Sequence, residues 1–280
     1  MTAALSVIIP AHNEAVVLEG LLAGLAADDA LEIVVAANGC TDDTVDVARS
    51  SSPRVLVIEL ADASKISALN AGDATATAWP RAYVDADVRV SGETLTRLAD
   101  RLQATGALAG APRLVVDLSA SSRAVRWYYS VWELTDYRRT APVGSGVYML
   151  SREGRSRFEG FPELIADDLF VQRLFEPAER LVPTDLEFTV RAPRRFGDLL
   201  HRAERIALGN LQLAAVDEAP AVPGASAGQL AARVGPRPSL WLPFIVYCIG
   251  YLLPRRRAAR RWRAGAVAHW NRDDSTRAVA

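Results

Sequence analysis

The feature that most constrains the fold is an alternation of short apolar runs with amphipathic stretches over the first hundred residues. Residues 5–9, 32–36 and 55–58 are apolar runs of strand length, and a fourth strand is expected to end at Val84. The stretches between them repeat apolar side chains at helical spacing. This alternation is typical of βαβ units, so we predict an α/β fold with a mostly parallel central sheet flanked by helices.

The length of 280 residues suits one large domain or two small ones that share a sheet. We expect one α/β domain with two halves, residues 1–115 and 116–217. An Ala/Pro/Gly-rich stretch, residues 218–238, is predicted to be a linker, and residues 239–280 form an apolar and basic tail.

Composition excludes some classes of function. The 32 basic and 33 acidic side chains nearly cancel, so nothing favours nucleic acid as a partner. Cys40 and Cys248 lie far apart and form no metal-binding or redox spacing, which fits a reducing cytoplasm. The N-terminus shows no basic and apolar secretion signal.

Polar residues follow three of the predicted strands. They are Pro10–Glu14 after the first strand, Asn38–Asp42 after the second and Asp85–Asp87 after the fourth. In an open, mostly parallel sheet, ligands bind beyond the carboxyl ends of the strands. We therefore expect these three segments to form one site.

Asp85 and Asp87 suit a hard divalent cation. In an extended segment alternate side chains point the same way, so the two carboxylates can share one metal ion or its water shell. Mg²⁺ or Mn²⁺ would fill its other positions with phosphate oxygens and water. The alternative interpretation is an ordinary loop with acidic turn residues.

Four motifs occur in order, and each falls on a predicted element: Ser6–Glu14, Asn38–Thr44, Lys65–Gly72 and Asp85–Asp87. Together they resemble glycosyltransferase family 2, over roughly residues 5–215. The resemblance implies a GT-A fold and a nucleotide diphosphate-sugar donor, with Mn²⁺ or Mg²⁺ as cofactor. It assigns donor binding to residues 1–115, and the acceptor and the catalytic base to residues 116–217.

The resemblance also implies roles for single residues. The nucleoside is expected to contact Pro10, His12 and Glu14, and the base is expected to lie beside Asn38 and Asp42. Many relatives have Asp in place of Asn38 and Ser in place of Cys40, so the base is left open. Lys65 is expected to meet the diphosphate or to support the loop near it. The remaining expected donor contacts are Asp85, Ala86, Gly144, Ser145, Arg173, Arg202 and Arg205, and His201 is a candidate third metal ligand.

A candidate base lies in Phe161–Arg173, which resembles the acidic pair of the family followed by Arg. The second acid, Asp168, is expected to deprotonate the acceptor hydroxyl, so that one in-line displacement inverts the anomeric centre. Asp167 stands where Glu is more usual. The alternative is that Asp167 caps a helix and Asp168 interacts with its dipole.

The tail begins with an apolar run, Leu240–Leu253, followed by six arginines up to Arg263. A membrane-spanning helix needs about 20 apolar residues, so this run is too short to cross a bilayer. We predict contact of residues 240–263 with the inner face of the cell membrane, and an acceptor that is lipid-linked. The alternatives are a helix packed on the domain and a dimer interface.

Two other functions compete with a transferase. A sugar nucleotidyltransferase should carry a Gly-rich and basic loop after the first strand, where this chain has Pro10–Glu14. A membrane-associated protein that binds a nucleotide-sugar without catalysis would keep the donor site but would not need Asp168. Fold alone cannot separate these functions.

Overall fold

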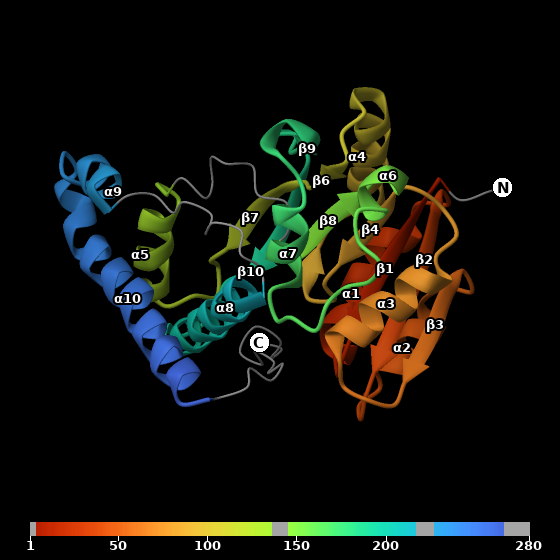
Figure 1. The fold of residues 1–280 in the computed structure, drawn as a ribbon, viewed down its shortest axis with the longest axis horizontal. Coiled ribbons are helices and arrows are strands. Elements are labelled where there is room, and N and C mark those ends of the chain that lie inside the picture. Colours follow the sequence, from red (N-terminus) through yellow and green to blue (C-terminus); the bar gives the residue numbers. More distant parts are fainter. Residues whose placement is uncertain (1–3, 136–144, 217–226, 266–280) are drawn as a thin grey trace.

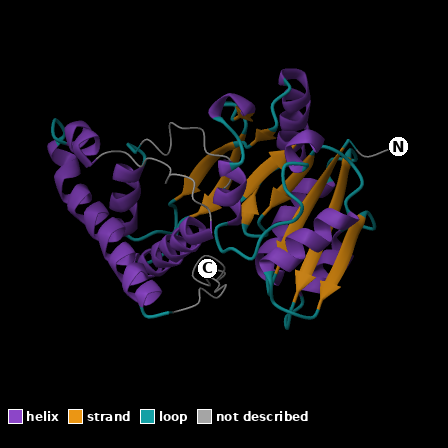
Figure 2. Ribbon diagram, in the orientation of Figure 1, coloured by secondary structure: helices purple, strands orange, loops and turns teal. Residues whose placement is uncertain are grey.

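The computed structural model describes residues 4–135, 145–216 and 227–265. A seven-stranded sheet of order β3-β2-β1-β4-β8-β6-β9 forms the centre, and a smaller sheet of order β5-β10-β7 continues beside it (Figures 1 and 2). The predicted α/β class is confirmed. The strands of the larger sheet are β1 (Leu5–Ala11), β2 (Leu31–Asn38), β3 (Val55–Leu60), β4 (Arg81–Val84), β6 (Ala109–Gly110), β8 (Val147–Leu150) and β9 (Arg180–Leu181).

Strands β1 to β4 are parallel neighbours, and helices cover both of their faces. Alternate side chains of β1 point to opposite faces: Val7 and Ile9 belong to one buried cluster, and Ile8 belongs to another. Burial on both faces explains why these strands read as continuous apolar runs. The helices around them are α1 (Ala15–Ala26), α2 (Thr44–Ser51), α3 (Lys65–Thr75) and α4 (Gly92–Thr105).

The sheet changes direction after β4, because β8 pairs with β4 antiparallel. In the smaller sheet β10 (Glu187–Arg191) pairs antiparallel with β5 (Val88–Arg89) and parallel with β7 (Arg113–Asp117). Two short helices, α6 (Arg152–Arg155) and α7 (Asp167–Arg173), follow β8. The place where the sheet changes direction is therefore next to the helix that carries the predicted acidic pair.

The C-terminal helices form a layer of their own at one end of the molecule (Figure 1). Helix α10 (Trp241–Arg263) packs against α5 (Arg123–Trp132) and α8 (Phe196–Val216). At Gly250 a Cβ atom would lie 2.7 Å from the ring of Tyr128, so glycine permits this close helix contact. The predicted apolar run of the tail is thus the first part of one long helix, and Pro243 and Gly250 do not end it.

Two sequence-based expectations differ from the structure in detail. From its residue type Asn13 would be expected to cap the first helix, but it has a φ of 52° and the N-cap is Glu14. Part of the predicted 218–238 linker is ordered as helix α9 (Ala227–Val234), whose Leu230 and Val234 pack with α10. In the part of the chain that the structure describes, none of the helices combines the length and apolar character needed to cross a bilayer.

A buried cluster of ion pairs forms around Asp73, a residue of α3, and a substitution there tests its contribution to stability. Asp73 is 6% exposed and contacts Arg81 at 2.8 Å, Arg155 at 2.9 Å and the hydroxyl of Tyr83 at 2.5 Å. Removing the carboxylate in Asp73→Ala leaves two buried guanidinium groups without it. We expect a loss of about 3 kcal/mol in the free energy of unfolding, measured by urea denaturation. The exposed Asp100→Ala on α4 is the control, and an equal loss there would contradict this assignment.

Candidate functional site

The first part of the site lies where β1 and β2 end. Asn38 is fully buried, and its amide nitrogen donates to the carbonyl of Ala11 at 2.8 Å. The ring of His12 lies 2.6 Å from the carbonyl oxygen of Asn38 through its Nδ1. The polar residues after these two strands therefore lie together, as the sequence predicts. Asn38 also braces the end of β1, a role that its position in a turn motif did not reveal.

Side chains of the α2 segment fix the loop after β1. The buried Glu14 donates its backbone N–H to the hydroxyl of Thr44 at 2.7 Å. Asp42 accepts from the backbone N–H of Thr44 at 3.0 Å and from that of Ala15 at 3.3 Å. Asp42 thus joins the starts of two helices. Thr44 was part of the motif Asn38–Thr44 but was not singled out as a site residue.

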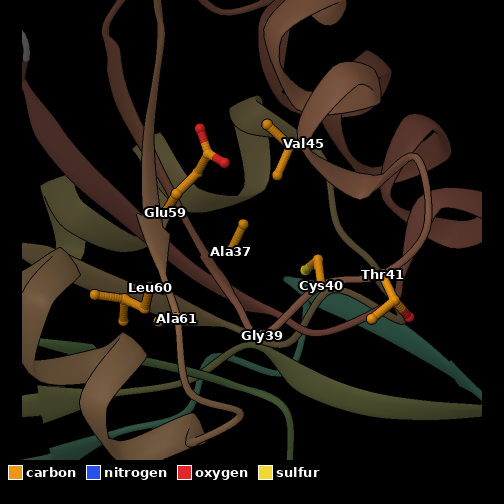
Figure 3. Close-up of a pocket in the computed structure, with 8 residues that line it drawn as sticks. All are labelled: Ala37, Gly39, Cys40, Thr41, Val45, Glu59, Leu60 and Ala61. Atoms are coloured by element: carbon orange, nitrogen blue, oxygen red, sulfur yellow. The ribbon is translucent and has the colours of Figure 1, made fainter.

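A pocket of about 230 Å³ opens beside this region, between the β2–α2 loop and the end of β3 (Figure 3). Its walls come mostly from small side chains near the ends of β2 and β3, with the apolar Val45 and Leu60 and the acidic Glu59, and none of the candidate metal or base residues takes part. It is a candidate place for part of a donor nucleotide. The lining residues are Ala37, Gly39, Cys40, Thr41, Val45, Glu59, Leu60 and Ala61.

The second part of the site is centred on Lys65, the first residue of α3. Its ammonium nitrogen lies 2.9 Å from a carboxylate oxygen of Asp85 and 3.0 Å from one of Asp167. One cation therefore connects the end of β4 to the start of α7. Lys65 and Asp167 are 102 positions apart in the sequence, and only the resemblance indicated that these residues belong to one site.

Burial and charge act in opposite directions on this pair. Burial alone would lower the pKa of Lys65, but the charges of Asp167 and Asp85 outweigh it and raise that pKa above its ordinary value. Burial raises the pKa of Asp167 to about 6, although the charge of Lys65 acts to lower it. At neutral pH Lys65 is therefore charged, and its positive charge stabilises the buried carboxylate of Asp167.

Asp168 has a different environment from Asp167. Its carboxylate accepts from the backbone N–H of Ser145 at 3.0 Å and from its own neighbour Leu169 at 2.8 Å. Ser145 has a φ of 65°, and the next residue, Gly146, accepts from the N–H of Asp85 at 2.8 Å. The loop before β8 thus holds both the metal candidate and the base candidate. Gly144, predicted as a donor contact, lies outside the described residues.

The Asp85–Asp87 segment is a turn and not the extended segment that the sequence analysis assumed. The N–H of Val88 donates to the carbonyl of Asp85 at 3.3 Å, which closes a four-residue turn with the buried Ala86 inside it. Asp85 and Asp87 therefore do not share one side in the way that alternate side chains of a strand do. Both carboxylates remain partly exposed at the end of β4, Asp85 with 36% of its side chain accessible.

The donor set was tested against a divalent cation. Among the described residues no three His, Cys, Asp or Glu side chains lie close enough together to hold a metal ion. His201, an exposed residue of α8, is thus not assembled with Asp85 and Asp87 into a three-ligand group. Mg²⁺ and Mn²⁺ are commonly held by only one or two carboxylates together with substrate phosphates. Asp85 and Asp87 fit that type of site.

The three arginines predicted to bind the donor lie on α7 and α8. Arg173 lies half-buried in the last turn of α7, and Arg202 and Arg205 lie half-buried on α8. Pro10 is buried within β1.

Tyr148 was not indicated by the sequence. Its hydroxyl is buried and has no hydrogen-bond partner among the described residues. Burial, and then the charge of Asp167, raise the pKa of Tyr148 above its ordinary value, so it stays a neutral donor.

Comparison with known proteins gives consistent matches. Residues 6–151 match the profile of Glycosyl transferase family 2. An uncharacterized glycosyltransferase, YibD of Escherichia coli (strain K12), is 29% identical over 183 residues, which are 52% of this chain and 52% of that protein. The chain therefore spans about half the length of the curated relative it matches.

Solved structures share the fold at low identity. A mannosyltransferase, PcManGT from Pyrobaculum calidifontis in complex with GDP-Man and Mn²⁺, has a TM-score of 0.61 at 20% identity and covers 97% of this chain and 77% of its own. S. aureus TarS residues 1–349 in complex with UDP has a TM-score of 0.55 at 17% identity, and the match covers 98% of this chain and 95% of that chain. The predicted GT-A fold agrees with these neighbours.

A double-mutant cycle tests the bridge through Lys65. Lys65→Met removes the cation beside the buried Asp167, and we expect it to lower the free energy of unfolding by about 3 kcal/mol. The double variant Lys65→Met/Asp167→Leu should lose less than the two single losses together, with a coupling of about 1–3 kcal/mol in urea denaturation. The exposed pair Arg101–Asp185 is the control, with a smaller coupling expected. Strictly additive losses at Lys65 and Asp167 would contradict the bridge.

Proposed function

We propose that this chain, which belongs to glycosyl transferase family 2, transfers a sugar from a nucleotide diphosphate-sugar to an acceptor hydroxyl with inversion at the anomeric carbon. The observation that carries the proposal is the joining of Asp85, at the end of β4, to the acidic pair of α7 through Lys65. A donor-side carboxylate and a candidate base thus lie in one site. Neighbours of the same fold were solved with GDP-Man and Mn²⁺ and with UDP, which supports a nucleotide-sugar donor.

The donor is proposed to lie along the ends of β1, β2 and β4. His12, Glu14 and Asp42 would contact or border the nucleoside, where their hydrogen bonds already fix the surrounding loops. Lys65 and the arginines Arg173, Arg202 and Arg205 would supply positive charge for the diphosphate. Asn38 would support the base side of the site through its hold on Ala11. The other proposed donor contacts are Pro10, Asp85, Ala86, Gly144 and Ser145.

Asp85 and Asp87 would hold Mn²⁺ or Mg²⁺, with His201 as a further candidate ligand. A bound cation would neutralise the negative charge that develops on the departing diphosphate. Two contacts of the chain already act on Asp85. Lys65 already places a cation 2.9 Å from Asp85, and the loop at Gly146 fixes the backbone of Asp85.

Asp168 is proposed to be the general base. Its carboxylate takes the proton of the acceptor hydroxyl while that oxygen forms a bond to the anomeric carbon, and the bond from that carbon to the diphosphate oxygen breaks. Backbone N–H groups of Ser145 and Leu169 fix the orientation of the carboxylate, and each oxygen keeps a lone pair for the incoming proton. Asp167 holds the start of α7 in place through Lys65.

The acceptor is proposed to be a hydroxyl of a polysaccharide, a lipid-linked sugar or a small molecule. A lipid-linked acceptor fits a location on the inner face of the cell membrane, with residues 240–263 in contact with it. Support for this location is the apolar run followed by arginines on one helix.

The transfer is tested by incubating the purified protein with Mn²⁺ and a panel of UDP-, GDP- and dTDP-sugars, with and without a membrane lipid extract. We expect release of nucleoside diphosphate from one donor, lost when the metal is chelated. Asp168→Asn should lower the rate by about 10²–10⁴-fold while nucleotide binding, measured by calorimetry, is retained. Asp87→Ala should lower both the rate and its dependence on Mn²⁺.

The exposed Asp100→Asn on α4 is the matched control and should keep full activity. Tight nucleotide binding without release from any donor would favour a nucleotide-sugar-binding protein without catalysis. Release of pyrophosphate from a nucleoside triphosphate and a sugar phosphate would favour a nucleotidyltransferase. Absence of nucleotide binding would overturn the proposal.

A further inference from the structure

Helix α10 presents an apolar row to the outside along its first three turns. Trp241, Ile245, Ile249 and Leu252 follow one another at spacings of four and three residues, which places them on one side of a helix. Their exposed fractions are 57%, 56%, 46% and 48%, and Leu242 beside them is 52% exposed. The other exposed large apolar residues in the described ranges lie on other elements: Val16 on α1, Leu56 on β3, and Ile206 and Val216 on α8.

The same side of the helix becomes basic in its second half. Arg256, Arg260 and Arg263 continue the row at the same spacings, and all three are exposed. Within the described part of the chain these three arginines make no ion pair, whereas Arg261, on a different side, pairs with Glu204 of α8 at 3.1 Å. Helix α10 contains no Asp or Glu. Any partner of this face must therefore supply both apolar contact and negative charge.

The opposite side of the helix is already occupied. Tyr247, Gly250, Pro254 and Ala258 are buried against α5 and α8. With one side fixed along its length, the helix cannot be surrounded by lipid, and it does not have the apolar length to cross a bilayer. Its exposed row is left facing outward.

We propose that the outer row of α10, Trp241 to Arg263, docks on the surface of a bilayer that contains anionic phospholipids. The apolar half enters the boundary between headgroups and acyl chains, and the arginines contact the phosphate groups. A second copy of this chain fits less well, because a pairing of two such rows sets arginines against arginines or against apolar side chains. This proposal deepens the membrane location proposed above and does not depend on the transfer chemistry.

The test is co-sedimentation of the full chain with vesicles of phosphatidylcholine alone or mixed with phosphatidylglycerol. We expect binding to the mixed vesicles that weakens as salt is raised, and little binding to phosphatidylcholine alone. Arg256→Gln/Arg260→Gln/Arg263→Gln should weaken binding by about 100-fold. Ile245→Ser/Ile249→Ser should weaken it by at least about tenfold at every salt concentration.

Matched controls remove the same groups elsewhere. Arg49→Gln/Arg97→Gln/Arg113→Gln lowers the net charge equally, and Val16→Ser/Leu56→Ser removes two exposed apolar side chains. Both should bind as the unchanged protein does. Equal losses in the controls, or no binding to anionic vesicles, would overturn the proposal. So would a stable dimer in light scattering that dissociates in Ile245→Ser/Ile249→Ser, because it would assign this face to a second copy.

Release of nucleoside diphosphate in solution separates the two proposals. It should be unchanged in the α10 variants, since none of their residues belongs to the catalytic site. If vesicle binding fails while release persists, the transferase proposal stands and the docking proposal falls. If vesicle binding persists and release of nucleoside diphosphate is never seen, the docking proposal stands and the transferase proposal falls.

Discussion

The arrangement of the site depends on one ammonium group between two carboxylates. Lys65 begins α3, and its contacts with Asp85 and Asp167 hold the end of β4 and the start of α7 at one point. Asp167 is almost completely buried, so its charge is tolerable only beside a cation. Asp168 is positioned by this pairing, because it is the next residue of the same helix. The proposed donor site on the parallel strands and the proposed base on a later helix thus share one electrostatic centre.

The meeting of polar residues at the ends of β1 and β2 could be predicted from the sequence because its information is local. The apolar runs of β1, β2 and β4 set the strands, and parallel order places the following polar residues at one edge. His12 and Asn38 do meet there. What local pattern could not give is the detail of each loop. Asp85 was assumed to lie in an extended segment, but its backbone N–H is taken by Gly146, and the chain turns at once.

The second half was less predictable because its contacts are long-range. The pairing of Lys65 with Asp167 crosses 102 positions, and no periodicity encodes it. Tyr148 gave no signal at all, since a buried tyrosine in a strand reads like any other core residue. The continuous helix α10 (Trp241–Arg263) was not predicted, and the reason is again a set of long-range contacts. Pro243 and Gly250 weaken an isolated helix, but packing on α5 and α8 outweighs that preference.

Helix α8 connects the outer helix to the candidate base. On one side Glu204 of α8 pairs with Arg261, and Ala207 and Leu208 pack with Ala258 of α10. On another side Gln212 accepts from the N–H of Ile165 at 3.1 Å, in the loop that leads into α7. A Cβ at Gly209 would lie 3.0 Å from Ile165, so the contact is close. The position of α10 therefore constrains the loop before Asp167 and Asp168. The loop that leads to the proposed base is thus fixed by the same helix layer that holds α10.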